Sequence, residues 1–333
     1  MKVCVLGSGG WGTALALNML ENGHDVTLWS FLEEEYRVLA ETGENPMLKG
    51  IPLPKELKLT TDMKAAAGCD AVVLATPSFA IRTTARNLSA IVDEGTPLIC
   101  VSKGIESGTS LRLSQVIAEE TGGKCPVVAL LGPTHAEEVG RGIPSAIVAA
   151  SEDRAAAELT QALFMNDHLR VYTSPDIVGA EIGAALKNVI ALCAGVCVGM
   201  GYGDNTRAML MTRGLTEIAR LGTALGGKQA TFAGLTGVGD LIVTCTSMHS
   251  RNNRCGMLIG QGVEPNEAVK QIGAVVEGFY AAKTARELAL KHNVEMPITE
   301  AAYAVLYEGM SPKEAMRSLM GRTKKHETED MWF

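Results

Sequence analysis

The sequence predicts an α/β fold, in which a doubly wound, mostly parallel sheet is followed by an all-helical second domain. Over roughly the first 175 residues, strand-like apolar runs alternate with helix-like segments, which is typical of a parallel sheet with helices on both faces. Beyond residue 178 no strand-like alternation remains, and the spacing of apolar residues predicts successive helices. We therefore expect a sheet domain over 1–178 and a helical domain over 179–333.

The composition limits the classes of function. The 333 residues are enough for two domains, and 47% hydrophobic with 20% charged residues is ordinary for a globular protein. The net charge of −7 argues against binding to nucleic acid, which usually requires a basic surface. None of the eight cysteines forms a C-x-x-C pair, so we expect reduced thiols in a cytoplasmic protein, with neither disulfides nor a metal site.

The sequence contains no signal for a membrane or for export. The longest apolar run, 189–200, spans 12 residues, which is short of the ~20 that cross a bilayer, so we expect a buried helix and no membrane insertion. The first strand begins at residue 2 without a basic leader or a cleavage site, so we expect no signal peptide.

The most informative stretch lies at the beginning of the chain. The apolar run 3–6 predicts a buried strand, and the alanine-rich segment 13–20 predicts a helix. Between them, Gly7, Gly9 and Gly12 have the G-x-G-x-x-G spacing, which in this context binds the pyrophosphate of a dinucleotide at the helix N-terminus. The alternative is a tight turn without a ligand, which the complete strand–turn–helix context makes the weaker hypothesis.

The end of the second strand, 25–29, bears on the choice of cofactor. In this type of fold that end faces the adenosine ribose, where an acid favours NAD and an arginine favours NADP. Ser30 and Phe31 fit neither rule. We interpret the acids that follow, Glu33 to Glu35, as the solvated first turn of a helix, a position that the helix dipole favours.

The other elements of the first domain follow in order. Short apolar runs predict strands at 57–59, 70–77, 97–101, 126–131, 145–150 and 169–172, and helices are expected at 78–88, 111–120 and 154–164. Ligands of such sheets bind beyond the C-terminal ends of the strands. The segments 7–12, 76–78, 103–106 and 132–135 should therefore line one crevice.

Helical patterns fill the second domain. We expect helices at 177–200, 208–222, 266–272, 278–292, 300–307 and 312–320. The first is long and apolar, and we expect a break in it near Gly195. Ser311-Pro312 and Pro265-Asn266 are typical helix starts.

Lys187 is the first candidate for chemistry. A lone lysine inside an apolar helix is costly to bury unless it is paired, and burial lowers its pKa toward the range of a proton donor or base at neutral pH. Hydride transfer to a carbonyl needs such a donor, and the neighbouring Asn188 offers an amide for orientation. A lysine whose stem follows the helix to solvent is an equally open alternative.

A second cluster lies at 244–254, where hydroxyls, amides and two arginines gather. Arg251 offers a planar fork of donors suited to phosphate, and Ser250 and Asn252 can add neutral donors. The alternative is a polar surface loop that caps the next helix. Asp240, in the glycine-rich turn before it, either pairs with Lys187 or is an ordinary turn aspartate.

Two further segments lie on the predicted ligand side of the sheet. Lys103 follows a strand end and either contacts a ligand or is an ordinary exposed lysine. The segment from Gly132 to Thr134 can cradle a ligand with backbone N–H groups. For His135 and Trp11 the sequence identifies no partner.

Together these stretches resemble one family, the bacterial cytoplasmic NAD(P)-dependent glycerol-3-phosphate dehydrogenases, over nearly the whole chain. The resemblance rests on nine short motifs in the same order: Gly7-x-Gly-x-Trp-Gly12, Ser102-Lys-Gly-Ile-Glu106, Gly132-Pro-Thr-His-Ala-Glu-Glu138, Leu186-Lys-Asn188, Gly203-Asp-Asn205, Thr212-Arg-Gly-Leu215, Gly237-Val-Gly-Asp-Leu241, Ser250-Arg-Asn252 and Val276-Glu-Gly278. It implies a Rossmann domain, a helical substrate domain, and reversible conversion of dihydroxyacetone phosphate to sn-glycerol 3-phosphate for phospholipid synthesis, with NAD(H) or NADP(H) as the cofactor.

The resemblance also implies residue roles. Lys187 would be the catalytic acid and base. The substrate would contact Lys103, Gly132, Thr134, Lys187, Asp240, Ser250, Arg251 and Asn252. Beside Gly7, Gly9 and Gly12, the cofactor would contact Gly10, Trp11, Lys103, Ala136, Arg251, Val275 and Glu277.

The sequence departs from the family pattern at two positions. The family often has an arginine two residues after the tryptophan that ends the second strand, where this chain has Phe31. A partner for a 2′-phosphate is missing there, which weakens the case for a strong NADP preference. Gly10 stands where the family often has serine, which removes one hydroxyl contact.

Two other functions stay open on the sequence. A β-hydroxyacid dehydrogenase is similar in architecture and also uses a helix lysine, although the cluster at 250–252 favours a phosphorylated substrate. A nucleotide-responsive regulator without enzymatic activity is the other, but nothing in the chain resembles an interaction module. The apolar helical domain leads us to expect a homodimer.

Overall fold

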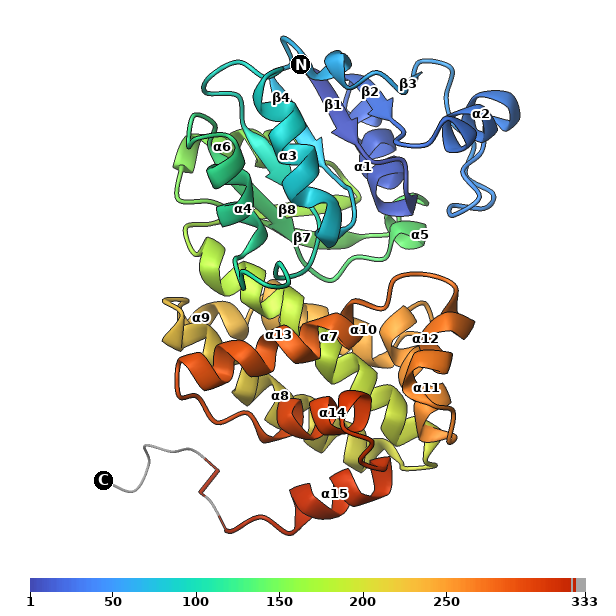
Figure 1. The fold of residues 1–333 in the computed structure, drawn as a ribbon. Helices are drawn as coiled ribbons and strands as arrows, with labels where there is room; N and C mark the ends of the chain where they lie inside the picture. The colour runs from blue at the N-terminus through green and yellow to red at the C-terminus, as the bar shows by residue number, and fades with distance from the viewer. Residues whose placement is uncertain (325, 328–333) are drawn as a thin grey trace.

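The structure is a computed structural model that describes residues 1–324, 326 and 327. It has two parts, stacked one above the other in Figure 1: a sheet flanked by helices, and a group of helices below it. The last strand ends at Ser174, and the first helix of the lower part begins at Ile177. The predicted fold class, a mostly parallel sheet followed by helices, is confirmed.

Eight strands form one sheet in the order β3-β2-β1-β4-β5-β6-β7-β8. Their bounds are β1 Lys2–Leu6, β2 Asp25–Trp29, β3 Lys58–Thr60, β4 Ala71–Leu74, β5 Leu98–Cys100, β6 Val127–Leu131, β7 Ser145–Ala150 and β8 Leu169–Ser174. Neighbouring strands are parallel except β6 and β7, which are antiparallel. The strand order reverses between β1 and β4, and a ligand crevice is expected at such a switch point.

Helices cover both faces of the sheet. One face carries α1 (Gly10–Glu21), α2 (Glu33–Thr42) and α6 (Arg154–Phe164), and the other carries α3 (Ile81–Ser89) and α4 (Leu113–Glu120). Alternate residues of each strand enter opposite cores, so that Val3 and Val5 pack with α1 while Cys4 and Leu6 pack with α3. Because both faces are buried, the strands are continuous apolar runs, which is why they were readable in the sequence.

The lower part is built around α7. The helices are α7 Ile177–Gly199, α8 Asp204–Ala224, α9 Gln229–Phe232, α10 Asp240–Thr246, α11 Arg251–Gly260, α12 Pro265–Ile272, α13 Glu277–Lys291, α14 Pro297–Tyr307 and α15 Pro312–Met320. The first half of α7 also packs against β6 and β7, so this helix joins the two parts. The sequence missed α9, α10 and α11, because these helices, of four to ten residues, are too short to show a helical apolar periodicity, and α11 begins with four polar residues.

The predicted break of α7 near Gly195 is wrong, since the helix runs through this residue. The glycine instead allows α11 to approach closely. A Cβ on Gly195 would lie 2.0 Å from a carbonyl oxygen of α11, and a Cβ on Gly256 would lie 2.0 Å from a carbonyl oxygen of α7. Gly199 and Gly260 repeat the arrangement one turn further on. Small residues thus bring the two backbones into direct contact.

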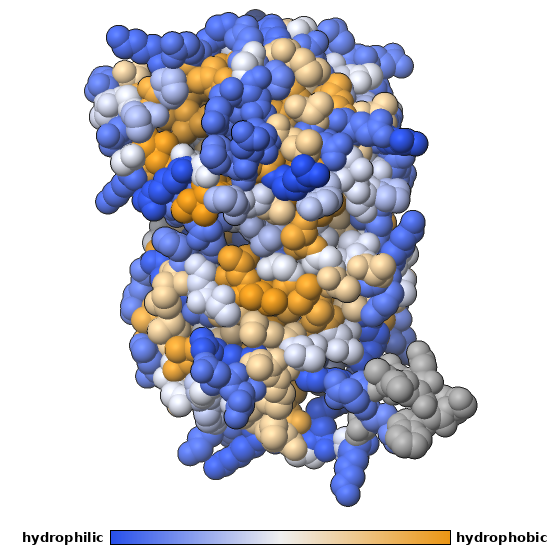
Figure 2. All heavy atoms as spheres, turned by 180° about the vertical axis from the view of Figure 1, so that it is seen from behind, coloured by the Kyte–Doolittle hydropathy of each residue, from blue (hydrophilic) through white to orange (hydrophobic). Residues whose placement is uncertain are grey.

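At 23 residues and a mean hydropathy of 1.8, α7 is long and apolar enough to cross a membrane. The 12-residue run read from the sequence was an underestimate, because Lys187 interrupts a longer apolar segment. Of its most apolar window, 78% is buried inside the protein, as expected for a central core helix. Seen from behind in Figure 2, hydrophobic residues gather in a band across the helical part.

Candidate active site

The glycine turn after β1 has the geometry that a dinucleotide requires. Gly7 has φ +125°, and a Cβ there would lie 2.7 Å from the carbonyl oxygen of Ala75. A Cβ on Gly12 would lie 2.0 Å from the carbonyl oxygen of Gly7, so α1 and β1 pack closely. A Cβ on Gly9 would meet no atom within 4 Å, which leaves room for a phosphate at the start of α1. The three glycines therefore fit the tight turn, the close packing and the open approach of this motif.

The loops that follow neighbouring strands converge on this turn, as predicted. After β5, Ser102 donates a hydrogen bond to the carbonyl oxygen of Thr76, which follows β4. After β6, Ala136 begins the short helix α5 (Ala136–Val139), which the sequence had not revealed. The Cβ of Ala136 lies 3.6 Å from where a Cβ on Gly10 would be. The loops after β1, β4, β5 and β6 therefore lie together at one edge of the sheet.

Lys187 lies buried in α7, with 5% of its surface exposed. Its ammonium group donates hydrogen bonds to the carboxylate of Asp240 and, over 2.7 Å, to the hydroxyl of Thr244. Asp240 is fully buried and begins α10, directly after a π-helical turn, Leu235–Gly239. The sequence left open whether Lys187 is buried or reaches solvent, and whether Asp240 pairs with it or is a turn aspartate. The structure shows a buried ion pair between the two.

The environment of Lys187 changes its acidity. Burial lowers the pKa of Lys187 from 10.5 to about 7. The carboxylate of Asp240 opposes this shift, and the ammonium of Lys103 adds to it. An amine with such a pKa can both give and accept a proton near neutral pH.

Lys103 reaches the same carboxylate from the sheet domain. Its Nζ donates to Oδ2 of Asp240 over 2.8 Å and to the carbonyl oxygen of Gly132 over 2.8 Å. Its side chain is 18% exposed, so it is not an ordinary surface lysine. Thr134 also donates to the carbonyl oxygen of Gly132, over 3.3 Å. The loop after β6 thus fixes Lys103 beside Lys187.

The polar segment 244–254 is largely helical. Ser250 caps α11, and its hydroxyl accepts the backbone N–H of Asn253 over 3.2 Å. Arg251 is the first residue of the helix and is exposed. The buried amide of Asn252 donates to Oδ1 of Asn188 over 3.0 Å and accepts the N–H of Gly278 over 2.8 Å. Asn252 therefore ties α11 to α7 and α13, next to Lys187.

The start of α13 meets the sheet domain. The hydroxyl of Ser78, after β4, contacts both carboxylate oxygens of Glu277 at 2.9 and 3.0 Å. Burial raises the pKa of Glu277, against the hydrogen bond from Ser78 and the charge of Arg251. Val275, two residues before, is half-buried in the preceding loop. Glu277 and Val275 therefore lie where the two parts of the molecule meet.

The structure gives neighbours to the two residues that had none in the sequence. The ring of His135 lies 5.6 Å from that of His249, and its Nε2 is buried without a hydrogen-bond partner in the described part of the chain. Burial lowers the pKa of His135, so the ring is neutral at neutral pH. Trp11 and Ala136 both pack against a small cluster of Ala14, Leu48 and Ile51.

Sequence reasoning gave no individual binding role to four side chains that follow strand ends or lie beside Lys187. Thr244 lies one helical turn after Asp240, and this spacing was the available signal. Phe31 and Phe79 follow β2 and β4 and are 76% and 73% exposed, which is unusual for rings of this size. Ser78 sits in a Thr-Pro-Ser sequence at the end of β4, and nothing in the sequence indicated its contact with Glu277.

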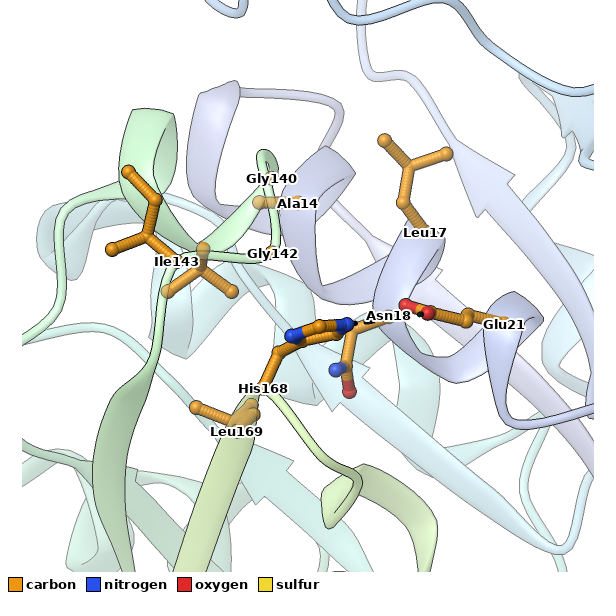
Figure 3. A pocket seen from close by; sticks show the side chains of 10 residues that line it. Ala14, Leu17, Asn18, Glu21, Gly140, Gly142, Ile143, His168 and Leu169 are labelled. Carbon is orange, nitrogen blue, oxygen red and sulfur yellow. Dashed lines mark ion pairs between the residues drawn. The ribbon is translucent and has the colours of Figure 1, made fainter.

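A small cavity of about 60 Å³ lies elsewhere, between α1, the segment after α5 and the start of β8 (Figure 3). Leu17, Asn18, Glu21 and His168 are among its lining residues, and none of the residues around Lys187 lines it. It is therefore separate from the crevice at the strand ends.

Two family models together match most of the chain. The N-terminus model of NAD-dependent glycerol-3-phosphate dehydrogenase matches residues 2–157, and the C-terminus model matches residues 176–317. A Bacillus pumilus protein named glycerol-3-phosphate dehydrogenase [NAD(P)+] is 52% identical, over 99% of this chain and 97% of that protein.

Solved structures agree with these matches. Glycerol-3-phosphate dehydrogenase from Coxiella burnetii has a TM-score of 0.92 and 36% identity, over 96% of this chain and 99% of that one. A D-mandelate dehydrogenase structure, with a TM-score of 0.63 and 14% identity over 95% and 99% of the two chains, shares the fold alone. From the two family models and these similarities, the chain belongs to the NAD-dependent glycerol-3-phosphate dehydrogenase family.

Proposed function

We propose that this chain is an enzyme that interconverts dihydroxyacetone phosphate and sn-glycerol 3-phosphate with NAD(H) or NADP(H), and so supplies glycerol 3-phosphate for phospholipid synthesis. One observation carries the proposal: a buried lysine, paired with Asp240, lies where the loops after the strands meet the helical part. Family membership and the names of the relatives support the choice of substrate.

The glycine turn holds the cofactor in this proposal. Gly7, Gly9 and Gly12 bring its pyrophosphate to the N-terminus of α1. The remaining contacts come from Gly10, Trp11, Lys103, Ala136, Arg251, Val275 and Glu277. The exposed rings of Phe31 and Phe79 offer surfaces for the adenine. When bound, the nicotinamide supplies or accepts the hydride at C2 of the substrate.

The first turn of α11 binds the phosphate of the substrate. Arg251 offers a bidentate fork, and the hydroxyl of Ser250, which accepts a backbone N–H, keeps its own hydrogen to donate. The backbone N–H of Asn252 lies in the first turn, at the positive end of the helix dipole. Holding the phosphate there positions C2, so that binding energy far from the reacting carbon contributes to the rate.

Lys187 moves the proton. In the reductive direction its ammonium gives a proton to the C2 oxygen, and the neutral amine is then reprotonated from solvent. In the oxidative direction the neutral amine accepts the hydroxyl proton. Lys103 lies across the same carboxylate, and the two ammonium groups favour the negative charge that develops on the oxygen. Gly132 and Thr134 form the wall that fixes Lys103.

The proposal extends to the organisation of the protein. Residues 1–178 bind most of the cofactor, and residues 179–333 supply the acid/base and the phosphate site. The protein works in the cytoplasm as a homodimer. Eight free cysteines fit a reducing compartment, and the hydrophobic band of the helical part (Figure 2) offers a surface for a second copy.

The function is tested by comparing substrates that differ only in the phosphate. We expect kcat/KM for dihydroxyacetone phosphate with NADH to exceed that for dihydroxyacetone by at least about 1,000-fold, because the phosphate anchors the substrate. Turnover of 3-hydroxy acids with NAD⁺, with none of dihydroxyacetone phosphate, would instead identify a β-hydroxyacid dehydrogenase. If neither dihydroxyacetone phosphate nor a 3-hydroxy acid is turned over, the proposed reaction is wrong.

A further inference from the structure

Ser8 and Glu35 join the glycine turn to the helix that follows the second strand. Ser8 lies between Gly7 and Gly9 and is 8% exposed. Its hydroxyl donates a hydrogen bond to Oε2 of Glu35 over 3.3 Å. Glu33 to Glu35 form the first turn of α2, as predicted. Glu35 also accepts the hydrogen bond from Ser8, which the sequence did not indicate. Glu35 is exposed, and its carboxylate lies beside the glycine turn.

The location of this carboxylate suits contact with the adenosine half of the cofactor. β2 lies next to β1 on the side away from β4, and in this fold the adenosine half of the cofactor extends over the end of β2. A pyrophosphate bound at the start of α1 would direct the adenosine ribose toward the space between the glycine turn and the start of α2. A carboxylate bound to Ser8 is therefore placed to accept hydrogen bonds from the ribose hydroxyls. In NADP(H) the 2′-hydroxyl is replaced by a phosphate.

Within the described part of the chain, Glu35 forms no ion pair with a lysine or arginine. The residues between β2 and α2 are Ser30, Phe31 and Leu32. Arg37 is two residues after Glu35, about 200° further around the helix, so it faces another direction. Lys58, on the neighbouring β3, forms an ion pair with Asp25 over 2.6 Å, at the opposite end of the strands.

The hydroxyl of Ser30 adds a second observation. This residue is fully buried directly after β2, and its Oγ has no hydrogen-bond partner within the described part of the chain. Because Ser30 has no exposed surface, a ribose hydroxyl would reach this Oγ only if the chain after β2 shifts when the cofactor binds.

We infer that Glu35, held by Ser8, recognises the adenosine ribose of the cofactor and makes the enzyme select NAD(H) over NADP(H). The inference rests on the proposed function for its assay, and it goes beyond the names of the relatives, which give the cofactor as NAD(P)+ without a preference. Selection has two parts: hydrogen bonds to the 2′-hydroxyl of NAD(H), and repulsion between Glu35 and the 2′-phosphate of NADP(H).

The direct test compares the two cofactors with dihydroxyacetone phosphate at one ionic strength. We expect the wild-type protein to have a kcat/KM for NADH at least about tenfold above that for NADPH, mainly through KM, since the two nicotinamides are chemically identical. Equal values for the two cofactors, or a preference for NADPH, would overturn the inference. Neither result would affect the proposed reaction.

Two variants on the same helical turn separate a specific effect of the Glu35 carboxylate from the effect of net negative charge in this region. Glu35→Gln should reduce the NADH preference at least about fivefold, mostly by improving KM for NADPH, because the repelling charge is lost. Glu34→Gln removes the same charge one position earlier and is the matched control, with an expected change below about twofold. Equal effects of the two variants would show a diffuse field and contradict the role of Glu35.

A binding measurement keeps the inference independent of turnover. Calorimetry with 5′-AMP and with adenosine 2′,5′-bisphosphate reports the ribose site alone. The wild-type protein should bind 5′-AMP more tightly, and Glu35→Gln should narrow the difference. Tighter binding of the bisphosphate by the wild-type protein would contradict the inference, even if the protein turned over no substrate at all.

Discussion

The ammonium groups of Lys103 and Lys187 bind the two oxygens of a single buried carboxylate, that of Asp240. Lys103 comes from the loop after β5 and Lys187 from the central helix α7, so this carboxylate joins the two parts of the molecule. When Lys187 is protonated, two positive charges and one negative charge leave the group with an excess of positive charge. Such an excess suits a phosphorylated substrate whose carbonyl oxygen becomes negative during the reaction.

Replacing Asp240 by asparagine keeps its size and removes its charge. We expect kcat to fall at least about 100-fold, because the two lysines then repel each other and lose their fixed positions. Steady-state kinetics with dihydroxyacetone phosphate and NADH measure the loss. Asp25→Asn, which removes the exposed ion pair with Lys58, is the control and should change kcat little. A variant at position 240 with half of the wild-type kcat would contradict the shared-carboxylate arrangement.

The pH dependence should have opposite signs in the two directions of the reaction. The pKa of Lys187 is lowered to about 7 by burial, so the amine is largely protonated below pH 7 and largely neutral above it. Reduction needs the protonated form, so its kcat should fall as pH rises through about 7, whereas kcat for oxidation should rise. Profiles of kcat from pH 5.5 to 9 in both directions check this. Two profiles that change in the same direction would exclude Lys187 as the titrating group.

Arg251→Gln should weaken binding of the phosphate. We expect KM for dihydroxyacetone phosphate to rise at least about tenfold, since a bidentate, charged donor is replaced by a neutral amide. KM for dihydroxyacetone, which lacks the phosphate, should change much less. Arg254→Gln alters an exposed arginine three residues later in the same helix and is the matched control. Similar effects on both substrates would place Arg251 away from the phosphate.

The contact between α7 and α11 should not tolerate a side chain. Gly256→Ala would bring a Cβ within 2.0 Å of the carbonyl oxygen of Leu192, so the helices must separate. We expect the free energy of unfolding to fall by about 2–3 kcal/mol. At Gly203 a Cβ would meet no atom within 4 Å, and Gly203→Ala should cost no more than about 1 kcal/mol. Urea denaturation compares the two, and equal losses would mean that the close approach contributes nothing specific.

The sheet was predictable because its physical signals are local. Buried parallel strands are short apolar runs, and the strand–glycine–helix sequence at 2–21 is contiguous. The sequence therefore placed β1, β2 and α6 within a residue or two of their observed bounds. For α1 the prediction began at residue 13, three residues after the observed start at Gly10. It failed at Gly195, where the smallness of the residue serves contact with a distant helix rather than a bend.

The candidate site was predictable in its members but not in its connections. Lys187 stood out as a charge in an apolar helix, and Asp240 was named as its potential partner. The sequence did not reveal three contacts between residues that are 27 to 199 positions apart. They are the contact of Lys103 with the same carboxylate, of Ser78 with Glu277, and of Ser8 with Glu35. Such contacts are set by tertiary packing, for which a single sequence contains no local signal.

The most direct test of this account is the turnover of Lys187→Met, which keeps most of the length of the side chain and removes the amine. We expect oxidation of NADH with dihydroxyacetone phosphate to fall at least about 1,000-fold, while NADH titration by fluorescence shows nearly unchanged cofactor binding. If the variant binds NADH normally and keeps more than about a tenth of the wild-type kcat, another group transfers the proton and the proposed mechanism is wrong.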